Sequence, residues 1–170
     1  MRGWLLGALV VGAWGTAVAQ DVAPAAAAPK VLPAGIEDSK LVTATPLAFG
    51  TGSDALQPES QAAIASMAAL LKDKTYISQV RVEGHVAGIG AAEADALGGR
   101  RALSVARALV AAGVECKRIL PVTFGANKPR AVAGSPENTR VEVVVTALRD
   151  KAIGGMPLDG GGLVVGDACK

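Results

Sequence analysis

The sequence predicts an α/β protein, an α+β sandwich with the element order βαβαβ and one further strand. Apolar residues between Ile64 and Leu71 recur at i, i+3, i+4 and i+7, which is the spacing of one helix face. Residues 77–83 alternate between apolar and polar side chains, as expected of a half-buried strand. Residues 141–145 are β-branched except for Glu142, which is typical of a central strand. Strands that alternate with helices pack as layers.

The other elements follow in order. Residues 43–49 are predicted to form the first strand and 50–53 a turn, after which Pro58 suits the first turn of a helix. A second helix is expected from about Leu97 to Ala112, ended by Gly113.

Beyond that helix, residues 119–124 read as a third strand. Residues 125–137 contain Gly and Pro and read as a loop that leads into the final strand.

The ends of the chain differ in composition from the middle. Residues 1–20 predict a secretory signal peptide, because Arg2 precedes a short apolar run and small residues follow. Residues 21–40 are rich in Ala and Pro and predict a linker; 41–149 are the expected domain, and 150–170 a Gly-rich, irregular tail. The exported chain is then expected to have no transmembrane segment and, without a Cys near the cleavage site, no lipid anchor.

Charge and cysteine content narrow the classes of function. The chain has 17 basic and 15 acidic residues, and loss of Arg2 with the signal leaves a net charge of 16 − 15 = +1, which gives no reason to expect nucleic-acid binding.

In an oxidising compartment, Cys116 and Cys169 predict a disulfide that fixes the tail, with two free or intermolecular thiols as the alternative. His85 is the sole histidine and has no neighbouring ligands in the sequence, so no metal site is predicted.

The segment 80–106, VRVEGHVAGIGAAEADALGGRRALSVA, resembles the core motif of the OmpA-like peptidoglycan-binding domain, in which a GHTD-type turn leads into an LSxRRA-type helix. Gly84 and His85 match the GH pair, and residues 97–102 match LSxRRA. The similarity extends over residues 43–148 and includes a GxGxxxP-type loop at 125–129 and an NRRVE-like 138–142. It implies a mixed sheet with both helices on one face.

The resemblance also implies a ligand, the diaminopimelate of the peptidoglycan stem peptide, and no cofactor. By position, Arg101 is the arginine that grips the ligand carboxylate, because a guanidinium can donate two parallel hydrogen bonds. Arg140, Asp95, His85 and Gly84 complete the expected binding set.

Several residues depart from the family pattern. The turn aspartate is replaced by Ala87, and the helix-start serine by Gly98. The segment before Leu97 is about one residue short, so the family asparagine falls on Ala94 or Asp95. Loss of one partner of a desolvated charge pair costs about 2–5 kcal/mol. Asp95 or Glu83 are the candidates to replace the missing carboxylate.

Three functions remain open at this point. The first is a non-catalytic peptidoglycan-binding protein in the periplasm of a diderm bacterium, associated with the cell wall or outer membrane. The second is a degenerate module, supported by Ala87, that binds envelope proteins or has a structural role. The third is an enzyme, which lacks support because no nucleophile and base are evident. Local alternatives also remain: His85 shaping the turn, Arg100 and Arg101 as exposed helix charges, and Arg140 in a structural ion pair.

Overall fold

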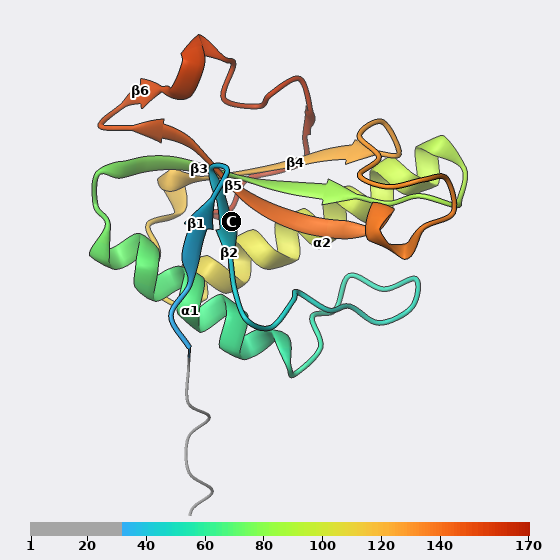
Figure 1. Ribbon diagram of the computed structural model, residues 1–170, viewed down its shortest axis with the longest axis horizontal. Helices are drawn as coiled ribbons and strands as arrows, with labels where there is room; N and C mark the ends of the chain where they lie inside the picture. Colours follow the sequence, from blue (N-terminus) through green and yellow to red (C-terminus); the bar gives the residue numbers. More distant parts are fainter. Residues whose placement is uncertain (1–31) are drawn as a thin grey trace, which may run out of the picture.

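The computed structural model describes residues 32–170 (Figure 1). The predicted signal peptide and the linker up to residue 31 lie outside the described residues. Within residues 32–170, no helix is long and apolar enough to span a membrane.

The described residues form one seven-stranded mixed sheet, with the order β1-β2-β5-β3-β4-β7 and with β6 paired to β5. β3 runs parallel to β4 and antiparallel to β5, which places β3 in the middle of the sheet. The predicted α/β class and its mixed sheet are therefore confirmed. The strands are β1 (Gly35–Glu37), β2 (Lys40–Val42), β3 (Ile77–His85), β4 (Ile119–Gly125), β5 (Arg140–Leu148), β6 (Lys151–Ala152) and β7 (Leu163–Val164).

Both α-helices pack on one face of the sheet, as the resemblance implied (Figure 1). They are α1 (Ser60–Asp73) and α2 (Ala91–Ala111); the short 3-10 helices are η1 (Cys116–Arg118), η2 (Pro136–Asn138) and η3 (Ile153–Gly155). Leu71 and Leu109 are fully buried against Val80 and Val82 of β3 in a core of aliphatic side chains. Removing these side chains from water is the main stabilising term of such a core.

The segment 43–49 is not a strand, contrary to the prediction. Only Phe49 forms an isolated bridge, with Leu56. The buried Ser60 hydroxyl accepts from Ala48 N–H and donates to Ala48 C=O. A side chain therefore makes the hydrogen bonds that a neighbouring strand would make to these backbone groups. Pro46, which lacks an N–H, also disfavours pairing here.

Helix α2 begins six residues earlier than predicted, at Ala91 instead of Leu97. The glycines suggested a long turn, but residues 91–97 contain four alanines, the best helix formers, with Glu93 in the favourable first turn. The predicted C-terminal end is correct: Gly113 has a φ of 92°, and the N–H of Val114 donates to Leu109 C=O.

Two hairpins add strands that the sequence analysis missed. Asp38 and Ser39 both have positive φ and connect β1 to β2, within the range predicted as linker. Arg149 and Asp150 likewise connect β5 to β6. Both are two-residue turns with positive φ at both positions, the pattern of a type I′ turn. Asp-Ser and Arg-Asp lack the glycine that marks such turns in a sequence.

The C-terminal tail is only partly irregular and crosses the face of the sheet opposite the helices, here called the second face (Figure 1). It carries η3 and β7, and β7 pairs with β4. The predicted disulfide is present: Cys116 and Cys169 are bonded, with 5.1 Å between their Cα atoms.

Candidate functional site

The second face of β3 carries three buried polar side chains, Arg81, Glu83 and His85, which point the same way because they alternate along the strand. Arg81 donates from Nε to Glu83 Oε1 at 2.7 Å and from an Nη to the same oxygen. Its other Nη donates to Leu158 C=O of the tail. The tail therefore covers the face of β3 that the sequence predicted to be exposed to solvent.

His85 lies at the end of β3 and is only 1% exposed. Its ring stacks on Phe124 at a centroid distance of 5.5 Å, and its Nε2 is 3.2 Å from Glu83 Oε2. Nδ1 is buried without a partner. This geometry places an N–H on Nε2, because that nitrogen faces a carboxylate. His85 is thus locally hydrogen-bonded beside the turn.

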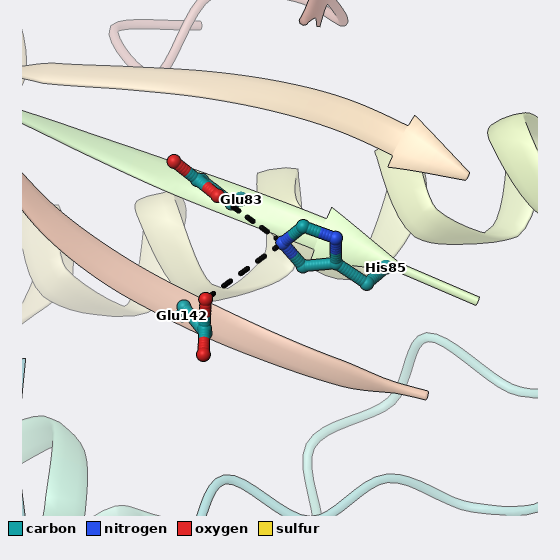
Figure 2. A group of neighbouring side chains, drawn as sticks. All are labelled: Glu83, His85 and Glu142. Carbon is teal, nitrogen blue, oxygen red and sulfur yellow. Dashed lines mark hydrogen bonds and ion pairs between the residues drawn. The ribbon is translucent and has the colours of Figure 1, made fainter. Parts of the chain in front are cut away.

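Glu142 of β5 lies directly opposite Glu83, and its Oε2 is 3.9 Å from His85 Nε2 (Figure 2). Two facing carboxylates repel each other unless cations compensate them. Glu142 Oε1 is 3.0 Å from Lys40 Nζ and 3.1 Å from Arg140 Nε. Arg130 Nη1 is 3.7 Å from the same oxygen. Glu142 is thus the centre of a cationic cluster.

These contacts set the ionisation of both acids. Burial alone would raise the pKa of Glu83, but hydrogen bonds from His85 and Arg81 outweigh it and lower this pKa to about 2. Burial opposes the shift of Glu142 in the same way, yet Arg140 and Lys40 keep its pKa below the usual range. Both side chains are therefore carboxylates at neutral pH.

A divalent metal ion is not favoured at this group. One atom each of Glu83, His85 and Glu142 lies within 4.8 Å of the others, a spacing that could close on a metal (Figure 2). Yet the two acids are already in contact with four cationic side chains, those of Lys40, Arg81, Arg130 and Arg140. The cationic side chains thus already outnumber the carboxylates by two, and a divalent cation would add two more positive charges.

Arg101, the expected ligand arginine, is 7% exposed on α2 and turns toward the 50–53 turn. Nε donates to Ser53 C=O at 2.8 Å, one Nη donates to Gly50 C=O at 3.2 Å, and the guanidinium lies 5.0 Å from the centre of the Phe49 ring. Burial lowers the pKa of Arg101, and the charge of Asp54 opposes that shift. Two of its three nitrogens are thus committed to neutral carbonyls.

The remaining expected site residues are spread around the GH turn. Gly84 packs against Gly98 of α2, so it is a backbone contact and presents no ligand group. Asp95 on α2 lies beside Gly125 at the end of β4, while Ala87 N–H donates to Thr139 Oγ1 at 3.2 Å. Arg140 belongs to the Glu142 cluster. Of the expected residues, the structure thus brings His85 and Arg140 together at Glu142, whereas the hydrogen bonds of Arg101 go to Gly50 and Ser53.

Sequence reasoning missed two partners of the acids, the buried Arg81 beside Glu83 and the exposed Arg130 beside Glu142. Arg81 and Glu83 were assigned to the outer face of a half-buried strand. The signal available was the alternation Arg-x-Glu-x-His, followed by a Gly-rich tail with a cysteine that could fix it across that face.

Comparison with known proteins agrees with this fold. The OmpA family matches residues 48–142, more than half of the chain, and the chain belongs to that family. The peptidoglycan-associated lipoprotein of Burkholderia pseudomallei superposes with a TM-score of 0.53 at 27% identity, over 59% of this chain and 88% of that one. The OmpA-like domain of FopA1 from Francisella tularensis gives 0.53 at 26% identity, over 65% and 75% of the two chains.

The periplasmic domain of Helicobacter pylori MotB shares the fold at 21% identity, with a TM-score of 0.54 over 65% of this chain and 78% of that one. No curated protein matches the chain.

Proposed function

We propose that this chain is a non-catalytic envelope protein of a diderm bacterium that is exported to the periplasm and binds peptidoglycan. The observation that carries the proposal is membership of the OmpA family over the segment that contains the GH turn and Arg101. A related solved structure is that of a peptidoglycan-associated lipoprotein, which supports the same class of ligand.

The proposed ligand group is the diaminopimelate of the stem peptide, with Arg101 attracting its carboxylate. Among the described residues, no carboxylate lies within 4 Å of the Arg101 guanidinium, whose hydrogen-bond partners are backbone carbonyls. A buried cation with dipolar partners alone retains attraction for an anion. With Nε and one Nη already engaged, the ligand would meet a single nitrogen and the field of the charge instead of a two-point grip.

Binding is expected to be weak, because Ala87 offers no charge to the ligand ammonium. Glu83 is already paired with Arg81 and His85. Asp95 lies eight residues after Ala87 in the first part of α2, and we propose that it compensates in part. The same two facts, Ala87 and the engaged Arg101, favour the second candidate function, a degenerate module that contacts envelope proteins without binding the wall.

Retention on purified sacculi tests the proposal. We expect weak retention of the wild type, loss of retention in Arg101→Ala, and at least about thirtyfold tighter retention in Ala87→Asp, which restores a charge pair. Arg100→Ala is the matched control. This neighbouring side chain is 55% exposed, and its ion pair with Asp54 is long, with 4.0 Å between Nε and Oδ1. Thermal unfolding checks that each variant is folded.

Retention only in Ala87→Asp would identify a site that has lost its function and would support the second candidate. Absence of retention in both the wild type and Ala87→Asp would overturn wall binding through diaminopimelate.

A further inference from the structure

A pocket of about 370 Å³ opens where β2 separates from β5. The two strands are paired only at Lys40 and Val144, after which the chain leaves the sheet through residues 43–47. Figure 1 shows this segment passing below the first half of β5. That half of β5 has β3 on one side and the pocket on the other.

The charges around this pocket do not balance. Its charged lining side chains are Lys40, Arg130, Arg140 and Glu142, which sum to 3 − 1 = +2. All three cations lie within 4 Å of one atom, Glu142 Oε1. One carboxylate cannot neutralise three neighbouring cations, so the pocket attracts a second anion.

Arg140 is the most enclosed of these cations, with its side chain 16% exposed. Its Nε is buried and close to Glu142, but the N–H does not point at that oxygen well enough to form a hydrogen bond. Its Nη atoms reach the Lys128 and Glu137 carbonyls only at 3.4–3.5 Å. Such long contacts leave donor capacity for a stronger acceptor.

The remaining walls are apolar side chains and strand backbone. Leu41, Leu47 and Met67 are among the residues that line the pocket. The N–H of Val145 donates to Ser39 C=O and so points toward β2. Because alternate residues of a strand point their N–H groups to the same side, the N–H of Val141 faces the pocket, beyond the last paired residue. An extended chain could pair there.

We propose that this pocket binds the terminal carboxylate of a short extended peptide with small apolar side chains. The carboxylate lies among Lys40, Arg130 and Arg140, the methyl groups contact the apolar wall, and the peptide backbone pairs with the open edge of β5. None of the residues that contact Arg101 lines this pocket, so its ligand is bound whether or not Arg101 binds the wall.

Titration of the 15N-labelled protein with N-acetyl-alanyl-alanine tests the proposal. We expect chemical-shift changes centred on the amides of residues 139–143 and on Lys40, and weaker binding as salt rises. The L,L and D,D peptides are titrated separately: because the ligand pairs as an extended strand with β5, we expect the L,L peptide, which represents a protein terminus, to bind more tightly, and tighter binding of the D,D peptide would overturn this assignment. The C-terminal amide of each peptide should not bind.

Arg130→Ala should weaken binding about tenfold, since it removes one of the three cations. This side chain is 61% exposed, so the fold should tolerate the change. Arg107→Ala, an exposed arginine outside the pocket, makes the same change in net charge and should bind as the wild type does. Equal binding of the amide-capped peptide, shift changes outside the pocket, or equal affinity of Arg130→Ala and Arg107→Ala would overturn the proposal.

Discussion

The buried ion pairs on the second face make individual side chains sensitive to acid. Glu83 is held between Arg81 and His85, and its pKa is about 2, against 4.5 for an ordinary glutamate. A group whose pKa is lower in the folded state contributes stability above its unfolded value. That contribution is lost as the pH falls from about 4.5 toward 2.

The first prediction concerns Glu83→Gln, which removes this titration. At pH 7 the variant should be less stable than the wild type, because Arg81 loses its carboxylate. The difference in the free energy of unfolding should shrink by about 2 kcal/mol between pH 7 and pH 2.5, because over this range Glu83 takes up a proton in the unfolded wild type while it stays largely ionised in the folded protein. Urea denaturation at several pH values measures this difference.

Glu93→Gln on the exposed first turn of α2 is the control and should show no such convergence with the wild type. A difference for Glu83→Gln that stays constant with pH would show that Glu83 has an ordinary pKa in the folded protein.

The residue types at the site could be predicted from the sequence, but their partners could not. The motif placed Arg101 on a helix next to the GH turn. It did not indicate that two nitrogens of Arg101 donate to the carbonyls of Gly50 and Ser53. Every residue has a backbone carbonyl, so the sequence does not show which carbonyls an arginine will bind. Arg140, considered as either a ligand or an ion-pair residue, does lie against Glu142.

At the scale of elements, the contact between β3 and α2 depends on two glycines. A Cβ placed on Gly84 would lie 1.9 Å from Gly98 C=O. A Cβ on Gly98 would lie 2.7 Å from Thr123 Oγ1. The strand and the helix therefore approach at a distance that no larger side chain permits, and this contact holds the GH turn against α2.

We predict that Gly84→Ala destabilises the protein by about 3 kcal/mol, because the strand or the helix must shift to accommodate the methyl group. Gly90→Ala is the matched control: its added methyl group would have no neighbour closer than 3.7 Å, and its loss should stay within about 1 kcal/mol. Chemical denaturation of both variants measures the effect. Similar losses would indicate that the backbones can separate without cost.

Elements with strong periodicity were predicted well, and those fixed by tertiary contacts were not. Helix α1 and strands β3, β4 and β5 follow from apolar spacing. The loop at 43–49 depends on a hydrogen bond from Ser60, twelve residues later than Ala48, and no local pattern reveals it. The two hairpin strands depend on turns without glycine.

For the whole molecule, the tail and its disulfide join the last residues to the body of the domain. Cys116 and Cys169 are 53 residues apart, and closing a loop of this length restricts the unfolded chain. Between them, the tail supplies Leu158 C=O to Arg81, and Gly162 packs over Phe124.

We predict that Cys116→Ser/Cys169→Ser lowers the free energy of unfolding by about 2–4 kcal/mol. Amide hydrogen exchange should increase first in residues 158–168, because the bond is the covalent anchor of this segment. Reduction of the wild type should reproduce both effects. Unchanged exchange in the tail would show that its noncovalent contacts are sufficient to hold it.

The pairing of β7 with β4 has a consequence for the behaviour of the protein in a crowded compartment. An uncovered outer strand offers its backbone to any other chain in extended conformation, and such contacts are the usual start of aggregation. Leu163 and Val164 occupy that position on β4 within the same molecule, and a covalent bond five residues later keeps them in place. The oxidised protein is thus protected from polymerisation through the edge of β4. A molecule that never formed the disulfide would leave this edge open to other chains.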